Sequence, residues 1–138
     1  MTGFYERKIL PLLIDSACSQ PPMTNLRSRY VSQAVGKVLE VGIGSGLNLS
    51  HYGCAVESIT GVDPAEALTQ KARQRADRIR ADVAVIGVSG ESIPVRSETF
   101  DTVVCTWTLC SIPDPQAAIA EMYRALKPDG KLIFVEHG

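Results

Sequence analysis

The sequence lacks an excess of either charge. It carries 14 basic and 15 acidic residues, which give a formal net charge of -1, and it contains no basic run. Proteins that grip nucleic acid by its phosphates need clustered Lys and Arg side chains. The composition therefore excludes nucleic acid as an expected partner and favours a small-molecule ligand.

Cysteine and histidine are scarce and badly spaced for metal binding. The four cysteines, Cys18, Cys54, Cys105 and Cys110, form no CxxC pair, and only two histidines could join them. We therefore expect no metal site and no disulfide framework. Free thiols are typical of reducing compartments, so a cytoplasmic location is expected.

Long apolar runs are missing as well. The most apolar part of the N-terminal segment, 9–14, is interrupted by Pro11 and closed by Asp15. It is too short for a secretion signal and far below the ~20 residues of a membrane span. We expect this segment to pack over the domain, with peripheral contact to a membrane surface as the alternative.

From residue 37 onward, strand-like and helix-like segments alternate. This alternation predicts a helical lead-in over 1–36, broken at "SQPPM" (19–23), and one folded core over 37–138. Five short aliphatic runs separated by helical patterns are typical of a doubly wound, mostly parallel α/β sheet. The expected strands are 37–42, 58–63, 82–88, 100–107 and 131–136.

Two helices are expected to start at Asp-Pro pairs, with Asp63 and Asp114 as N-caps and Pro64 and Pro115 at the first helical positions. A short helix fits 46–52, and "KPDG" (127–130) predicts a turn. The helical spacing of apolar residues predicts two buried stripes: Leu68, Ala72, Ala76 and Ile79 on one helix, and Ala118, Ile119, Met122 and Leu126 on the other.

The stretch "VLEVGIGSG" (38–46) places three glycines at the end of the first expected strand. Glycines there allow a sharp turn and close approach of a ligand to the backbone. The spacing is GxGxG, and Leu47 stands where a dinucleotide fingerprint has its last small residue. Glu40, two residues ahead of the loop, would repel a diphosphate but suits a cation.

Asp63 ends the second expected strand, 21 residues after Gly42. An acidic side chain there can accept hydrogen bonds from both hydroxyls of a ribose. Because Asp is also a favoured N-cap, the residue alone does not decide between the two roles. Together with the glycine loop it favours ribose binding.

The order of these motifs resembles the class I S-adenosylmethionine-dependent methyltransferases, in particular the type 11 methyltransferase domain. The resemblance covers 37–138. It is carried by "VLEVGIGSG", "GVDPA", "GESIPVRSETFD" and "EMYRALKPDGKLIF". Two further stretches, "VVCTWTLCSIPD" and "GFYERKILPLLI", are similar to the bacterial and animal members related to thiol methyltransferases.

The resemblance implies a site for S-adenosylmethionine, with S-adenosylhomocysteine as the product. The aminoacyl end would lie against Glu40 and the backbone of Gly42, Gly44 and Gly46, and the ribose against Asp63. The family's usual acidic adenine contact aligns with Ser89. The remaining implied contacts are Pro64, Ala65, Gly90 and Glu91 for adenine, and Thr106 and Trp107 for the methionine part and the acceptor.

The implied reaction is methyl transfer to a small-molecule acceptor: a thiol, an amine or a lipid-like compound. The sulfonium is already a good leaving group, so the protein mainly has to orient the acceptor and exclude water. A thiol or protonated amine must also lose a proton. Glu136 and His137, after the fifth expected strand, are candidate bases, and a capping or solvated role is the alternative.

Members of the family normally continue past the fifth strand with a helix and two more strands. This resemblance implies an alternative in which the chain binds the cofactor without catalysis, or forms half of a shared site. The apolar "LIFV" (132–135) would then be an open sheet edge, which predicts a homo-oligomer.

An NAD(P)-dependent oxidoreductase is the other alternative. Tyr123 and Lys127 have the YxxxK spacing of short-chain dehydrogenases. Pro128 ends the helix directly after this pair, and the glycine spacing disfavours NAD. We therefore expect an amphipathic helix and turn rather than a catalytic pair.

Overall fold

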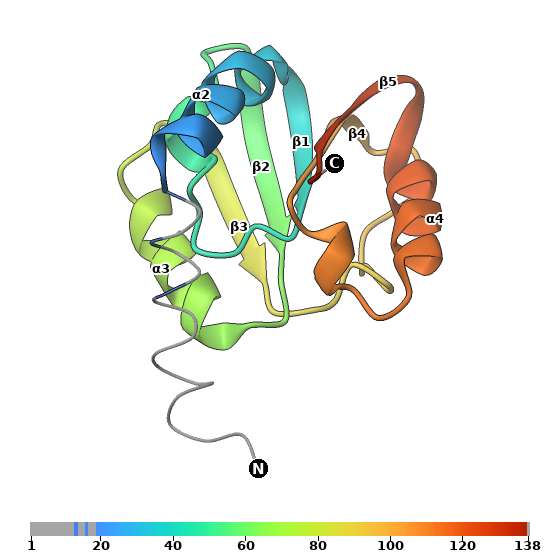
Figure 1. Cartoon of the computed structure of the whole chain (residues 1–138). Coiled ribbons are helices and arrows are strands. Elements are labelled where there is room, and N and C mark those ends of the chain that lie inside the picture. Colours follow the sequence, from blue (N-terminus) through green and yellow to red (C-terminus); the bar gives the residue numbers. More distant parts are fainter. Residues whose placement is uncertain (1–12, 14–15, 17–18, 138) are drawn as a thin grey trace.

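A computed structural model describes residues 13, 16 and 19–137 of the chain (Figure 1). The segment 9–14, for which we expected packing over the domain, lies almost wholly outside the described residues. The strands are β1 (Gly36–Val41), β2 (Val56–Val62), β3 (Asp82–Ile86), β4 (Phe100–Thr106) and β5 (Leu126–Val135), and the helices are α2 (Pro21–Tyr30), α3 (Glu66–Ala76) and α4 (Pro115–Ala125). Three 3₁₀ turns, η2 (Val31–Gln33), η3 (Leu49–His51) and η4 (Leu109–Ser111), complete the described elements.

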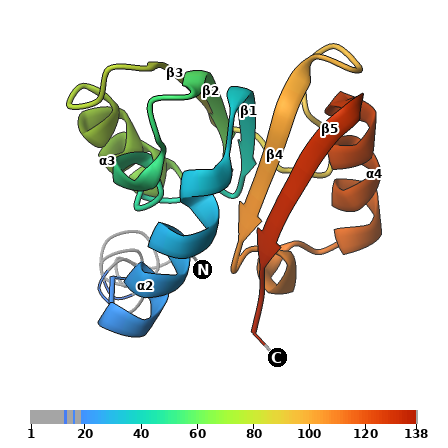
Figure 2. The ribbon, with the colours of Figure 1, turned by 90° about the horizontal axis from the view of Figure 1, so that it is seen from above.

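The five strands form one sheet with the order β3-β2-β1-β4-β5, and every pair of neighbours is parallel. This confirms the predicted doubly wound α/β class. Figure 2 shows α4 on one side of the sheet and α2 and α3 on the other. The central strands β1 and β4 are buried on both faces, as their continuous aliphatic runs predict.

Two apolar clusters hold the layers together. On the side of α2 and α3, Val31, Val38 and Ala72 are fully buried. On the side of α4, Leu39, Val103 and Met122 form the second cluster. Val31 and Ala34 follow α2, so this part of the lead-in packs directly against the sheet.

The strand order creates a crevice at the carboxyl ends of the strands. The chain runs from β1 outward to β2 and β3, and then crosses back to place β4 on the other side of β1. Connections therefore leave β1 and β4 in opposite directions. Ligands of open parallel sheets bind at such a reversal point.

The start of α3 differs from the prediction. The helix begins at Glu66 with Ala65 as N-cap, so Asp63 and Pro64 precede it. The reason is that the Asp63 carboxylate already accepts hydrogen bonds from the backbone N–H groups of Gly44 and Ala65. The helix also ends at Ala76, and Ile79 lies beyond it, half-buried against the core.

The start of α4 agrees with the prediction, because the Asp114 side chain caps the helix by accepting from the Ala117 N–H. Its buried stripe is partly different. Ile119 is 50% exposed, and the buried positions are Ala118, Met122 and Ala125, at spacings of four and three. Residues at 118 and 119 point about 100° apart on a helix, so only one of them can face the core.

The other predicted boundaries shift by a few residues. Leu126 already belongs to β5. The residues expected to form a turn, 127–130, lie within this strand, and the register between β4 and β5 shifts there. The short helix expected over 46–52 is only η3. In the lead-in, Pro21 and Pro22 open α2, where the missing N–H costs nothing.

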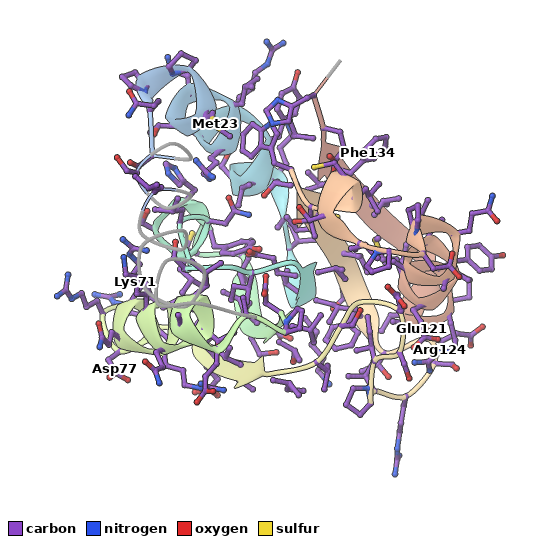
Figure 3. All side chains as sticks on the ribbon, turned by 60° about the horizontal axis from the view of Figure 1, so that its bottom comes forward. Met23, Lys71, Asp77, Glu121, Arg124 and Phe134 are labelled. Atoms are coloured by element: carbon purple, nitrogen blue, oxygen red, sulfur yellow. The ribbon has the colours of Figure 1, made fainter. Side chains whose placement is uncertain are left out.

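The long connection from β3 to β4 is held against α4 by hydrogen bonds to two paired side chains of this helix. Arg124 and Glu121 lie together on this helix (Figure 3), with Nε and Oε1 2.7 Å apart. Arg124 also donates to the carbonyls of Ile93 and Val95, and Glu121 accepts from the Ile93 N–H. These bonds hold the connection so that its first part, near Gly90, reaches the crevice.

Candidate cofactor site

A pocket of about 320 Å³ opens where β1, β2 and β4 end. Its wall is formed by the ends of these strands and the loops that follow them, by residues of the β3–β4 connection, and by one residue each of α2 and α3. The residues used below are Arg27, Glu40, Gly42, Gly44, Asn48, Asp63, Pro64, Ala65, Ser89, Gly90, Thr106, Trp107 and Thr108.

The glycine loop after β1 has the backbone geometry that only glycine adopts readily. Gly42, Gly44 and Gly46 have φ angles of +78°, +55° and +84°. A Cβ on Gly42 would overlap the Thr108 side chain, and one on Gly46 would press on the backbone of α3 at Ala72. A Cβ on Gly44 meets no protein atom within 4 Å, so this position faces open space in the pocket.

Glu40 lies at the end of β1, lines the pocket and is only 1% exposed. Its Oε1 accepts a hydrogen bond of 2.5 Å from the hydroxyl of Tyr52. Burial raises the pKa of Glu40 to about 8, although hydrogen bonds from Tyr52 and Asn48 and the charge of Arg27 oppose the rise. A ligand cation would therefore find a buried carboxyl group whose ionisation it can favour.

Asp63 follows β2 and faces the same pocket. Its two oxygens accept from Gly44 N at 3.1 Å and Ala65 N at 2.9 Å. Burial raises the pKa of this carboxyl group, while the two backbone hydrogen bonds lower it. The side chain thus ties the glycine loop to the segment before α3.

Most of the other predicted contact residues surround the same space. Pro64, Ala65, Gly90, Thr106 and Trp107 line the pocket. Two do not: Gly46 packs beneath the loop against α3, and the Glu91 carboxylate accepts from the Asp114 N–H at 3.2 Å. Ser89, at the family's usual acidic position, is part of the wall.

The candidate bases lie beside the pocket rather than in its wall. Glu136 Oε1 accepts from Thr108 N at 3.0 Å and Leu109 N at 3.1 Å, so it supports the loop after β4. The ring of His137 lies 6.2 Å from that of Trp107, tilted by 40°. The geometry of Glu136 is that of a loop anchor.

A chain of polar side chains that was not predicted joins α2 to this wall. Arg27 is 5% exposed and donates from Nε to Asn48 Oδ1 at 2.9 Å. Asn48 Nδ2 in turn donates to Thr106 Oγ1 at 3.0 Å. The Arg27 guanidinium also lies 4.8 Å from the centre of the Trp107 ring, in cation–π contact.

No sequence signal points to this chain of contacts. Arg27, Asn48 and Tyr52 belong to no motif, and 21 residues separate Arg27 from Asn48. Trp107 adopts a φ of +48°, which is unusual for a bulky residue. Such a conformation persists where surrounding contacts impose it.

The YxxxK pair is not part of the site. Tyr123 is 83% exposed on α4, and Lys127 pairs with Asp101 at 2.8 Å. Neither residue lines the pocket. This arrangement counts against the oxidoreductase alternative.

A glycine loop after the first strand and a carboxylate after the second, in one pocket of a doubly wound sheet, define a domain that binds a nucleoside-containing cofactor. Residues 39–134 match the family model of the type 11 methyltransferase domain. The chain therefore belongs to this family, the class I S-adenosylmethionine-dependent methyltransferases. This confirms the resemblance inferred from the motifs.

Curated relatives with several different names match the chain. It is 30% identical to phosphatidylethanolamine N-methyltransferase of Cereibacter sphaeroides, covering 78% of this chain and 54% of the relative. It is 34% identical to ubiquinone biosynthesis O-methyltransferase of Alkalilimnicola ehrlichii (79% and 47%) and 32% identical to human thiol S-methyltransferase TMT1B (75% and 44%). The chain spans about half the length of these relatives.

Solved structures share the fold. The YcgJ protein of Bacillus subtilis superposes with a TM-score of 0.73 at 25% identity, covering 83% of this chain and 50% of that protein. The N-methyltransferase NodS of Bradyrhizobium japonicum, solved with S-adenosyl-L-homocysteine, gives 0.74 at 22% identity (84% and 62%). No helix among the described residues is long and apolar enough to cross a membrane.

Proposed function

We propose that this chain binds S-adenosylmethionine in the pocket at the strand ends and transfers its methyl group to a small-molecule acceptor. The observation that carries the proposal is the placement of two carboxyl groups, Glu40 and Asp63, in one pocket with the backbone of Gly44. The cofactor has two positive groups and a ribose diol. Carboxyl groups suit both features.

Each side chain has a role in this proposal. Glu40 faces the ammonium group of the cofactor, and Asp63 accepts from the ribose hydroxyls. The segment Pro64–Ala65 and Gly90 flank the adenine, and Thr106 and Trp107 lie along the methionine part. Gly46 and Glu91 act indirectly, by supporting the glycine loop and the start of α4.

When bound, the cofactor would supply a methyl group that is attached to a positively charged sulfur, and this sulfur becomes a neutral thioether once the methyl group has bonded to the acceptor. The protein then has to align the acceptor and keep water out, and such alignment is worth roughly 7 to 11 kcal/mol in favourable systems. Trp107 and the loop held by Glu136 stand at the wall nearest the end of β4. An acceptor thiol or ammonium loses its proton to solvent or to a base such as His137, which is exposed next to Trp107.

The acceptor class stays broad in this proposal: a thiol, an amine or a lipid-like compound. The three curated relatives described above differ in name: a phosphatidylethanolamine N-methyltransferase, a ubiquinone biosynthesis O-methyltransferase and a thiol S-methyltransferase. The free cysteines Cys54, Cys105 and Cys110 support the inference of a reducing, cytoplasmic location.

A second candidate is cofactor binding without catalysis by this chain alone. The observation behind it is the apolar edge strand β5, which is exposed among the described residues. In that case the acceptor side of the site would come from a partner. We infer that a second copy joins through the edge strand β5, whose Leu132 and Phe134 are 45% and 60% exposed.

Calorimetry with S-adenosylmethionine and S-adenosylhomocysteine tests the binding step. We expect both compounds to bind, and no binding to the folded protein would refute the proposal. A labelled-methyl assay with thiol, amine and lipid acceptors then separates the candidates. Transfer to one class supports an enzyme, and tight binding without transfer to any class supports the binding-only alternative.

A further inference from the structure

We infer that Ser89 is a specificity-determining residue for the base of the cofactor, and that it contacts the purine ring through its hydroxyl group without reading the substituent at position 6. The pocket would then also accept purine cofactors that lack the 6-amino group. The inference rests on the proposed function and names the class of cofactor analogues that fit the site. Ser89 follows β3 and lines the pocket next to Gly90.

The part of the pocket proposed for the base is largely apolar. The base is proposed to lie between Pro64–Ala65 and Gly90. Three further side chains of the wall are apolar: Val62, Leu68 and Ile112. A Cβ on Gly90 would lie 2.6 Å from Val41 and 3.6 Å from Ile112, so the backbone of Gly90 lies close to apolar side chains. Contacts of this kind depend on the area and shape of a ring, which all purines share.

The carboxyl groups in and near the described pocket wall have other partners. Glu40 and Asp63 are the acidic residues of the wall. Glu40 is assigned to the ammonium group, and Asp63 accepts from two backbone N–H groups and is assigned to the ribose. The carboxylate of Glu91 accepts from the Asp114 N–H. Ser89 is therefore the polar side chain beside Gly90 that we assign to the base.

The hydrogen bond that Ser89 makes determines what it can offer to a base. Its Oγ accepts from the backbone N–H of Glu91 at 3.2 Å, and none of its described contacts uses the O–H. A serine hydroxyl has one O–H donor. Ring nitrogens of a purine accept hydrogen bonds, and they are present with or without a 6-amino group. A donor at this position therefore suits both kinds of ligand.

Recognition by the backbone is the competing explanation. Carbonyl groups next to Gly90 can accept a hydrogen bond from a 6-amino group without any help from a side chain. The two explanations differ in one measurable respect. Recognition by a carbonyl makes the wild-type protein prefer the ligand with the amino group, whereas recognition by the Ser89 O–H does not.

The test compares S-adenosylhomocysteine with its analogue in which hydrogen replaces the 6-amino group of the purine. The two ligands have the same net charge, the same ribose and the same amino-acid end, so only the edge of the base differs. We expect the dissociation constants for the wild-type protein, measured by calorimetry, to agree within about threefold. A preference of more than about tenfold for the amino ligand would overturn the inference.

Variants of Ser89 then test its role. Ser89→Asp supplies a carboxylate that accepts from the amino group and has no partner on the analogue, so this variant should prefer the amino ligand about ten- to a hundredfold. Ser89→Ala should bind both ligands about two- to tenfold more weakly than wild type, again without a preference. Ser111→Asp is the matched control, because it adds the same charge at another serine of the pocket wall and should affect both ligands equally.

Each outcome leads to a distinct conclusion. A Ser89→Asp protein that is folded but gains no preference, or a Ser89→Ala protein that binds both ligands like wild type, overturns the role of Ser89. If Ser89→Asp does not fold by circular dichroism, the wild-type comparison and Ser89→Ala decide. A wild-type protein that binds neither ligand refutes the proposed function instead.

Discussion

The hydroxyl of Tyr52 donates a hydrogen bond of 2.5 Å to the carboxyl group of Glu40 beneath the pocket. Burial raises the pKa values of both groups, that of Glu40 to about 8 and that of Tyr52 well above its usual range. Both raised pKa values favour the protonated, uncharged forms of Glu40 and Tyr52. We therefore predict that Glu40 keeps its proton at neutral pH in the ligand-free protein.

This pairing predicts how stability depends on pH. Between about pH 4.5 and 8 the unfolded chain has released the Glu40 proton and the folded chain has kept it. The folded state then binds more protons, so the free energy of unfolding of the ligand-free protein should fall as pH rises through this window, by up to about 1.4 kcal/mol per pH unit. Denaturant unfolding at a series of pH values measures it.

The matched variant is Glu40→Gln, which should flatten this dependence. Asp63, whose pKa burial also raises, acts in the same direction. His51, whose pKa burial lowers, acts in the opposite direction. The difference in the free energy of unfolding between wild type and Glu40→Gln isolates the effect of Glu40. If this difference is the same at every pH of the window, the pKa of Glu40 is not raised.

The Asp63 carboxylate is predicted to contribute strongly to cofactor binding. Asp63→Ala removes a charged acceptor worth about 1.5 to 3 kcal/mol, so affinity for S-adenosylmethionine should fall about ten- to a hundredfold. Glu66→Ala, at an exposed acidic residue of α3 outside the pocket, is the control. Unchanged affinity in a folded Asp63→Ala protein would leave Asp63 with only its bonds to Gly44 and Ala65.

Two glycines of the loop should respond differently to alanine. A non-glycine residue at such positive φ costs about 1 to 2 kcal/mol. Gly42→Ala adds a clash with Thr108, so its free energy of unfolding should fall by more than this amount. Gly44→Ala meets no protein atom, so its free energy of unfolding should fall only by the cost of the positive φ. Because the new methyl at position 44 enters the pocket, Gly44→Ala should lose most cofactor affinity. Thermal unfolding and calorimetry separate the two, and equal losses of stability would contradict this assignment.

Glu136 is predicted to act as an anchor of the loop after β4. Glu136→Gln keeps an oxygen for the N–H groups of Thr108 and Leu109, so stability and cofactor affinity should stay close to wild type. Glu136→Ala leaves both N–H groups without this acceptor and should lose about 1 to 3 kcal/mol of stability. If Glu136→Gln binds cofactor normally yet loses all methyl transfer to an accepted substrate, Glu136 acts as a base instead.

The exposed edge of β5 is predicted to mediate self-association. Phe134→Lys places a charge on the apolar edge, and edge lysines oppose strand pairing. Sedimentation velocity should then detect oligomers for wild type and monomers for the variant. Tyr123→Lys, at an exposed aromatic residue on α4, is the control. A monomeric wild-type protein at high concentration would exclude this mode of assembly.

The sheet could be predicted from the sequence because its central strands are buried on both faces, and burial of that kind forces continuous aliphatic runs such as "VVC" (103–105). The glycine loop was equally visible, since positive φ angles at three positions require glycine. Asp114 capped its helix as predicted because no other donor group competes for its carboxylate among the described contacts. These features depend on local chemistry.

The remaining features depend on contacts between distant segments. Asp63 does not cap α3, because its carboxylate accepts a hydrogen bond from the N–H of Gly44, which lies 19 positions earlier in the sequence. Arg27 reaches the site only because the folded chain brings α2 to Asn48 and Trp107. A single arginine in a polar helix has no periodicity or motif that would reveal such a contact.

The position of α2 has a consequence for engineering this protein. A fragment that starts at β1 would retain every strand of the sheet, the glycine loop and both pocket carboxyl groups. It would lack the one basic side chain among the described residues of the pocket wall, together with its stacking on Trp107. It would also lose Val31 and Ala34 from the core cluster on the side of α3, so removing α2 and the turn after it would weaken both the pocket wall and the packing of the sheet.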